Sequence, residues 1–149
     1  MLLNSICELE VVCCSPRTTA LEAARLMRQK HIGDLVVVDD DKESPTPIGI
    51  ITDRDIVIEV LGKDLDPGKT NVGSLVRRPV VVAHDQEDTT EVLERMRNHG
   101  VRRIPVVSSS GTLVGIVTVD DMLKRLAADA NLLTEIVSQE QRLEQRTRR

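Results

Sequence analysis

Two short segments of the sequence combine residue types that could bind a sugar joined to a phosphate. Thr52-x-x-Asp55 and Thr118-x-x-Asp121 each follow an apolar run and precede a predicted helix. At such a junction a threonine hydroxyl and the free helix N–H groups favour a phosphate, and a carboxylate can accept both hydrogen bonds of a ribose diol. The same spacing is close to a capping box, in which the two side chains only satisfy the helix start. Both roles stay open, and one residue pair can serve both.

Three arginines are a second indication of anion binding. Arg102 and Arg103 lie just before a predicted buried strand, where two guanidinium groups need an anion or a carboxylate as partner. The matching positions of the first half are Gly33 and Asp34, which supply no positive charge, but Arg54 could compensate there. We predict that Arg54, Arg102 and Arg103 contact phosphate and that the two clefts are unequal. The alternative for all three is surface ion pairing.

An adenine ring needs an apolar slot and backbone partners. The candidates for such a slot are Ile104 and Pro105, with Ile32, Val80 and Val82 as further members, and each of them could equally be plain core. These apolar residues therefore extend the predicted ligand site without defining it.

Composition argues against several other functions. The 24 acidic and 20 basic residues give a formal net charge of −4, and the chain has no Phe, Tyr or Trp on which bases could stack, so we expect no nucleic-acid partner. No nucleophile lies beside a base in any motif, so we predict no catalytic residue and no enzyme activity. The three cysteines and three histidines form no C-x-x-C or other ligand motif, so we predict no metal site.

The apolar stretches are short and interrupted by charge, so the sequence predicts no membrane span and no signal peptide. An odd number of cysteines outside any disulfide pattern agrees with a reducing compartment. We therefore expect a cytoplasmic protein.

The elements that must position these residues occur twice. Residues 11–38 align with residues 80–107 at an offset of 69, and residues 49–56 align with residues 115–122 at an offset of 66. Each half reads as β-α-β-β-α, and a three-stranded sheet with two helices cannot cover both of its faces alone. We therefore predict an α/β (α+β) fold in which the two copies pack face to face about a pseudo-twofold axis.

The predicted elements of the first half are strands at 11–14, 35–38 and 48–52 and helices at 19–30 and 53–61. Those of the second half are strands at 80–83, 104–107 and 113–118 and helices at 89–98 and 119–126. Short lead-in helices are expected at 5–9 and 72–76. The polar segment after Ala130 carries a thin apolar stripe, and it could be a dimer contact, a docking helix or a frayed tail.

These features together resemble a tandem pair of cystathionine β-synthase (CBS) domains, the arrangement called a Bateman module. The resemblance rests on the paired G-I-[IV]-T-x-x-D segments, the M-R-x-x-x-[IV] helix ends and VRRIPVV, and it covers residues 5 to 127. The sequences of these motifs are most similar to those of small stand-alone proteins of the hypoxic-response type. The predicted division is repeat 1 at 5–63, a linker at 64–71, repeat 2 at 72–127 and a C-terminal helix or tail at 128–149.

The resemblance implies a regulatory, signal-transducing module that binds an adenosyl ligand between its repeats. We expect AMP, ADP or ATP, with NAD and S-adenosylmethionine as further candidates. It also implies a homodimer of four repeats in a flat disk, with an unidentified protein partner as a further expectation. The alternatives are a ligand-free dimerisation or interaction module and a metal or thiol sensor.

Overall fold

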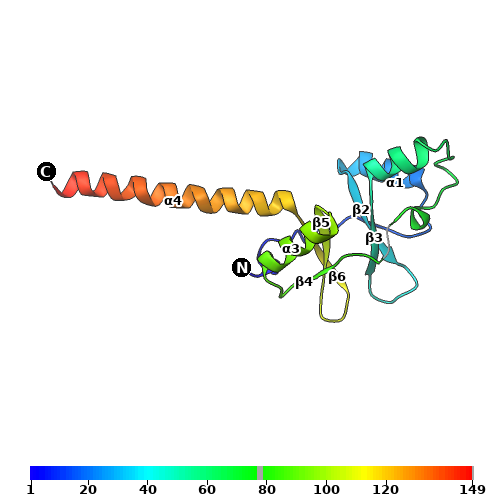
Figure 1. Cartoon of the computed structure of the whole chain (residues 1–149), viewed down its shortest axis with the longest axis horizontal. Helices are drawn as coiled ribbons and strands as arrows, with labels where there is room; N and C mark the ends of the chain where they lie inside the picture. The colour runs from blue at the N-terminus through cyan, green and yellow to red at the C-terminus, as the bar shows by residue number, and fades with distance from the viewer. Residues whose placement is uncertain (77–78, 149) are drawn as a thin grey trace.

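The computed structural model describes residues 1–76 and 79–148 and contains one three-stranded sheet in each half of the chain (Figure 1). The first half contains β1 (Cys13–Cys14), α1 (Ala20–Lys30), β2 (Asp34–Asp39), β3 (Thr46–Thr52) and α2 (Asp53–Ile56), which a π-helical turn (Val57–Leu61) extends. The second half contains β4 (Ala83–His84), α3 (Thr89–His99), β5 (Arg103–Val107), β6 (Leu113–Thr118) and α4 (Val119–Thr147).

The two sheets have the same topology. The central strand, β2 or β5, pairs in parallel with the short strand before it and antiparallel with the strand after it. Each antiparallel pair contains a β-bulge, between Val37 and Val38 in one sheet and between Val106 and Val107 in the other. The predicted β-α-β-β-α order of both halves is therefore confirmed.

Each sheet packs against helices of its own half to form a separate core. Leu35, Val37 and Ile51 are fully buried in the first core, and Ile104, Val106 and Val117 are fully buried in the second. These strands are nearly continuous apolar runs because both of their faces are covered.

The first helix of each half lies where its periodicity predicts. A capping box of Thr19 and Glu22 starts α1, and Met27 lies on its buried face. In α3 the capping residue is Asp88, whose side chain accepts a hydrogen bond from the Thr90 N–H group. The helix starts after an aspartate because its carboxylate caps as well as a threonine hydroxyl does.

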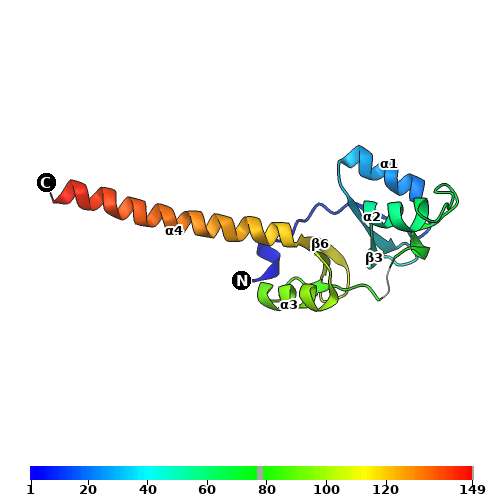
Figure 2. The same ribbon diagram turned by 45° about the horizontal axis from the view of Figure 1, so that its top comes forward.

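The segment that precedes each repeat packs into the core of the other repeat. Leu3 is fully buried in the second core, and its N–H group donates to the Glu87 carbonyl at 3.0 Å. Val72, 69 residues later, is fully buried in the first core, and its N–H group donates to the Thr18 carbonyl at 2.8 Å. Figures 1 and 2 both show the N-terminus beside α3 of the second half. The two repeats are therefore interlocked by their lead-in segments.

The lead-in helices are shorter than the sequence predicts. They are single 3₁₀ turns at Leu3–Ser5 and Val72–Ser74, so the first begins before the expected range of 5–9. The residues after the first of these turns are extended and not helical. Glu8 pairs there with Ile116 of β6 through backbone hydrogen bonds of 2.8 and 2.9 Å.

Two glycines permit this close approach. A Cβ atom on Gly49 of β3 would lie 2.6 Å from the Val76 Cβ atom, and one on Gly115 of β6 would lie 2.8 Å from the Glu8 carbonyl oxygen. Both distances are shorter than a normal contact. The glycine of each G-I-[IV]-T segment is therefore required where the lead-in segment of the other repeat crosses the sheet.

The second helix of the second half is much longer than predicted. The sequence places its end near Leu126, but α4 continues to Thr147 and projects away from both repeats (Figures 1 and 2). Only the end near Leu126 was wrong, because the helix that was one alternative for residues 128–149 is present as a continuation of α4. The segment after Leu126 has no helix terminator: the last glycine of the chain is Gly115 and the last proline is Pro105. Of the helices described, none is long and apolar enough to cross a membrane.

Candidate functional site

The two Thr-x-x-Asp segments lie where the last strand of each half passes into a helix. The Thr52 hydroxyl accepts from the Asp55 N–H group at 3.1 Å, and the Asp55 carboxylate accepts from the Thr52 N–H group at 2.9 Å. Thr118 and Asp121 repeat this arrangement at 3.1 and 3.0 Å, and the Thr118 hydroxyl lies 2.7 Å from the same aspartate oxygen. The capping role that the spacing indicates is therefore real at both positions.

Capping does not use the whole of either carboxylate. All of these bonds are to Oδ2 of Asp55 and Oδ2 of Asp121, and Oδ1 of each makes no hydrogen bond within residues 1–76 and 79–148. Both side chains are only partly buried. Each aspartate can therefore cap its helix with one oxygen and accept a hydroxyl of a ligand with the other.

An ion pair connects the two helix starts across the repeats. Asp34 lies opposite Thr52 in the first sheet, and Arg103 lies opposite Thr118 in the second. The Arg103 guanidinium and the Asp34 carboxylate are 2.5 Å apart, with side chains 32% and 23% exposed. Asp34 and Arg103 occupy equivalent positions at the repeat offset of 69. A residue can contact its own symmetry equivalent only near the axis, so this pair marks the pseudo-twofold axis.

The three predicted arginines differ in their availability. Arg103 is held by Asp34, whereas Arg102 is 72% exposed and has only a 3.5 Å contact with Asp120. The exposed Arg54 guanidinium makes no ion pair within the described ranges. Arg54 and Arg102 are therefore accessible to a phosphate as they stand, while Arg103 would first have to leave its carboxylate.

The predicted members of the adenine slot differ in burial, since Ile32, Val80 and Val82 are only partly buried. Ile104 and Pro105 are both fully buried, and Ile104 belongs to the second core. One pocket lies along distal α4 and another lies between α3 and α4, and neither is lined by a predicted site residue.

The cysteines are weak candidates for metal or redox chemistry. Burial raises the pKa of all three thiols, and that of Cys14 reaches about 11, with a smaller contribution from its neighbour Cys13. Within the described residues the one cluster of metal-ligating groups is Asp39, Asp40 and Asp41, all acidic, and Arg17 lies 2.9 Å from Asp41. The ion pair with Arg17 accounts for this acidic cluster without a metal ion.

We expect Cys14 to be almost unreactive toward iodoacetamide at pH 8. A pKa of about 11 in place of 9.0 lowers the thiolate fraction by roughly a hundredfold, and the thiolate is the nucleophile. Mass spectrometry of timed samples measures the rate, with the urea-unfolded chain as reference. The labelling rate should keep rising with pH above 9. Equal rates in the folded and unfolded chains at pH 8 would contradict the assignment.

The fold and the paired helix starts define a module made of two copies of one unit, with a Thr-x-x-Asp cap in each copy beside the contact between them. The family model for the CBS domain matches residues 4–62 and 72–128. The chain therefore belongs to the CBS domain family as a tandem pair, and the resemblance predicted from the sequence is confirmed.

Several characterised and uncharacterised proteins are similar to the chain. It is 38% identical over 120 residues to Hypoxic response protein 1 of Mycobacterium tuberculosis. The aligned region covers 80% of this chain and 81% of that protein. It is 37% identical over 115 residues to an uncharacterized protein of Methanopyrus kandleri, covering 77% of this chain and 57% of that protein. The chain thus spans little more than half of the second relative.

Solved structures share the fold. The crystal structure of Hypoxic Response Protein I with two coordinated zinc ions has a TM-score of 0.72 and 35% identity, covering 83% of this chain and 98% of that one. A CBS domain pair in complex with 5′-methylthioadenosine and S-adenosyl-L-methionine has a TM-score of 0.75 and 26% identity, covering 87% and 98%.

Proposed function

We propose that the chain is a regulatory module that binds an adenosyl ligand, with AMP, ADP or ATP preferred, between its two CBS repeats. The observation that carries the proposal is the divided use of Asp55 and Asp121, each of which caps a helix with one oxygen and leaves the other without a hydrogen bond among the described residues. That oxygen lies beside helix N–H groups that favour phosphate.

Two further observations support this function. A CBS pair of the same fold was solved with two adenosyl compounds, 5′-methylthioadenosine and S-adenosyl-L-methionine. In this chain Arg102 and Arg54 add exposed positive charge next to the two helix starts, where a nucleotide phosphate could pair with them, whereas 5′-methylthioadenosine has no anionic group and S-adenosylmethionine has only its carboxylate. The charge therefore favours a phosphorylated nucleoside.

The ion pair on the axis suggests how binding is transmitted. A phosphate near Arg103 competes with Asp34 for the guanidinium, and loss of this contact lets the repeats change their relative orientation. A ligand shifts such an equilibrium by its difference in affinity for the two orientations. A protein partner or a second subunit would detect that orientation, and on this proposal the chain itself catalyses no reaction.

A melting experiment with AMP, ADP, ATP, NAD and S-adenosylmethionine tests the proposal. A ligand at a hundredfold its dissociation constant stabilises the fold by roughly 2.7 kcal/mol. We expect a clear rise in Tm with at least one adenine nucleotide. Unchanged melting curves with all five compounds would instead favour a ligand-free interaction module.

Replacing the site carboxylates should weaken binding of the best nucleotide more than tenfold. Asp55→Asn and Asp121→Asn each keep an oxygen for the cap but remove the charge that accepts a ribose diol. Glu22→Gln is the matched control, because it removes the same charge from the third capping box, on α1. Isothermal titration calorimetry measures the dissociation constants. Wild-type affinity in both aspartate variants would refute the site.

A zinc-sensing function has less support. The related Hypoxic Response Protein I was solved with two coordinated zinc ions. Here the part of the chain that the structure describes brings no cysteine or histidine into a cluster of three ligating groups. Raised thiol pKa values also oppose the thiolate form that zinc prefers.

A further inference from the structure

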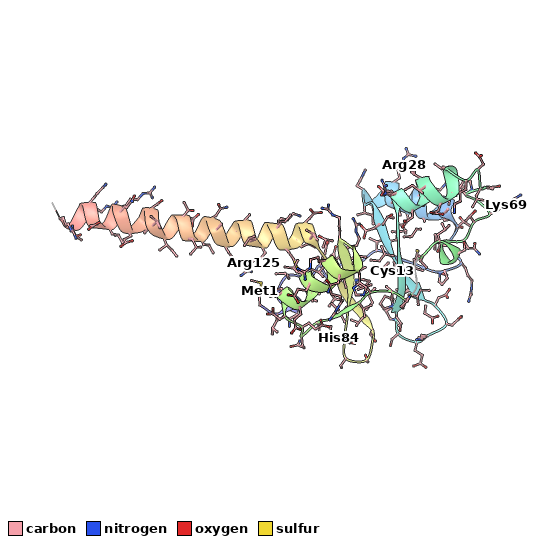
Figure 3. The ribbon with its side chains drawn as sticks, viewed as in Figure 1. Met1, Cys13, Arg28, Lys69, His84 and Arg125 are labelled. Atoms are coloured by element: carbon pink, nitrogen blue, oxygen red, sulfur yellow. The ribbon has the colours of Figure 1, made fainter. Side chains whose placement is uncertain are left out.

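The distal part of α4 has no packing partner in the chain. Every residue from 130 to 148 is exposed, and Figure 3 shows its side chains extending into solvent along the whole projecting helix. A lone helix of this length is marginal in water even for favourable sequences, because most helical stability in proteins comes from packing of an apolar face. The sequence of this face therefore decides what covers it.

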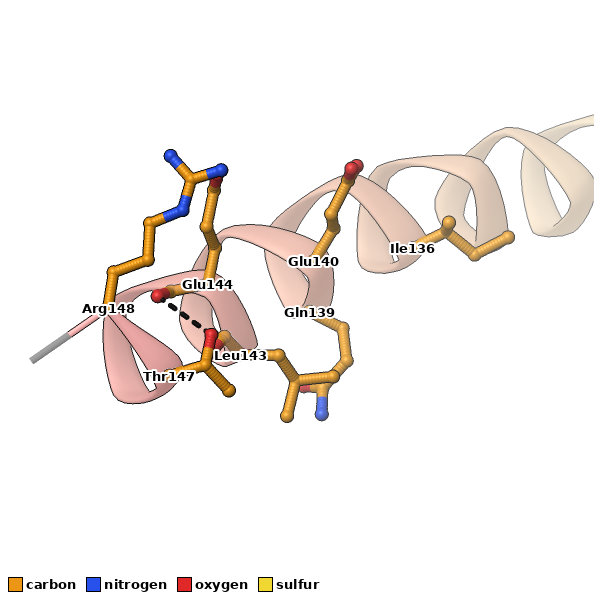
Figure 4. Close-up of a pocket in the computed structure, with 7 residues that line it drawn as sticks. All are labelled: Ile136, Gln139, Glu140, Leu143, Glu144, Thr147 and Arg148. Atoms are coloured by element: carbon orange, nitrogen blue, oxygen red, sulfur yellow. Dashed lines mark hydrogen bonds and ion pairs between the residues drawn. The ribbon is translucent and has the colours of Figure 1, made fainter.

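One face of α4 carries an apolar stripe. The large apolar residues of α4 are 50–66% exposed: Leu123, Leu126, Leu132, Leu133, Ile136, Val137 and Leu143. Of these, Leu126, Leu133, Ile136 and Val137 recur at spacings of three, four and seven along one face, which Leu132 and Leu143 widen on one side and Leu123 on the other. This pattern places them at neighbouring positions of a heptad, as at a helix–helix seam. Toward the C-terminus Glu140 and Glu144 enter the same face, and Glu144 pairs with Arg148 at 2.7 Å (Figure 4). We call Leu126, Leu133, Ile136 and Val137 the α4 stripe.

The stripe begins in a groove between α3 and α4. This groove has a volume of about 230 Å³ and a largely apolar lining that includes Met1, Leu93, Met122 and Leu126. Arg125 stands at its wall, and Figure 3 shows Arg125 close to Met1. Leu126 belongs to both the groove and the stripe. The exposed apolar surface is thus continuous from the second repeat along the helix.

We propose that a second copy of this chain covers the stripe, with the two α4 helices paired antiparallel. The proposal rests on charge. A parallel pair would place Glu140 against its own equivalent and Asp129 against its own, and like charges at a seam are destabilising. An antiparallel pair with Leu126 opposite Ile136 of the partner subunit brings Glu140 opposite the partner's Met122 in the groove. Arg125 lies one turn away in that groove, pairs with Asp129 of its own helix at 3.2 Å, and could be shared with the incoming Glu140.

The register follows from the same residues. Sliding the pair so that Leu126 meets the partner's Leu143 would place Asp129 opposite the partner's Glu140. With Leu126 opposite the partner's Ile136, Asp129 lies opposite the partner's Leu133. Glu140 lies opposite the partner's Met122, near Arg125, so the two acids no longer face each other. Because the pairing is twofold, each copy supplies one groove and one helix end, so the interface closes with two chains.

The response of the solution mass to stripe variants tests the interface, because a dimer formed through the repeats alone would have the same mass but would not respond to them. We expect twice the 16.5 kDa of one chain by light scattering. Leu133→Lys, at the centre of the stripe, should raise the dissociation constant at least about thirtyfold, as for a buried interface anchor. Asn131→Lys is the matched control, with the same added charge on the opposite side of the helix, and should stay dimeric. Circular dichroism checks that both variants remain folded. A monomeric wild type, or a dimer that tolerates Leu133→Lys, would overturn the proposal.

Photo-cross-linking tests the orientation. A benzophenone amino acid is introduced at Gln139 and the protein is mixed with an isotopically labelled copy, so that links between chains are identified by mass. The proposal expects links to partner peptides containing residues 89–126. Links confined to partner residues 136–148 would indicate parallel helices and refute it. Reversing the charges in Arg125→Glu plus Glu140→Lys should restore dimerisation that Glu140→Lys alone weakens.

Discussion

Replacing Leu3 with alanine is expected to lower the free energy of unfolding by about 3 kcal/mol, although the residue lies almost at the start of the sequence. Its side chain is fully buried in the second core, beside residues more than 80 positions away. Truncating a buried leucine removes its transfer free energy and leaves a cavity, and such changes cost roughly 2.7–5.0 kcal/mol in other cores. Urea unfolding followed by circular dichroism measures the loss.

The neighbouring residue supplies the control. Leu2 is 48% exposed, so Leu2→Ala should change the stability by less than about 0.5 kcal/mol. Hydrogen exchange of Leu3→Ala should show the loss of protection first in β4, β5 and β6, because Leu3 packs against that sheet. Faster exchange in β1, β2 and β3 alone would show that the side chain does not serve the second core.

Adding a single methyl group at Gly49 is expected to destabilise the chain by about 1–3 kcal/mol. The new Cβ atom would lie 2.6 Å from the Val76 Cβ atom and 2.9 Å from its Cγ2 atom, so the lead-in segment of the second repeat must move off the first sheet. Alanine is otherwise compatible with a strand here, because Gly49 does not have a positive φ. Denaturant unfolding of Gly49→Ala measures the effect.

A double-mutant cycle shows whether the cost comes from this contact. Val76→Gly removes the atoms that the methyl group meets, so the two changes together should cost at least 0.5 kcal/mol less than their separate effects predict. Gly68→Ala is the control, since its nearest neighbour would be the Asp66 carboxylate at 3.3 Å. Additive costs for Gly49→Ala and Val76→Gly would show that the crossing contact is not the cause.

The repeat allowed the elements to be predicted because their signals are local. Thr19 and Glu22 lie one helical turn apart and define the start of α1 from sequence alone. The apolar runs of β2, β3, β5 and β6 are equally local. The exchange of lead-in segments carries no such signal, because nothing near Leu3 states which of two similar cores it enters. The reason for Gly49 and Gly115 became clear only from the structure, in which Val76 and Glu8 cross the two sheets at these positions.

Of the candidate site, the local parts could be predicted from the sequence and the contacts between the repeats could not. The helix caps at Thr52 and Thr118 follow directly from their spacing. The partner of Arg103 could not be predicted, because Asp34 is 69 positions away and meets it only through the packing of two sheets. The full length of α4 could have been predicted from the absence of glycine and proline after Gly115.

The opposite charges at Asp34 and Arg103 also specify which halves associate. If two first repeats came together in the same way, two carboxylates would meet at the axis, and two second repeats would bring two guanidinium groups together. Only a mixed pair neutralises this position. Divergence of the duplicated unit at one residue thus selects heterotypic association within a chain over homotypic exchange between chains.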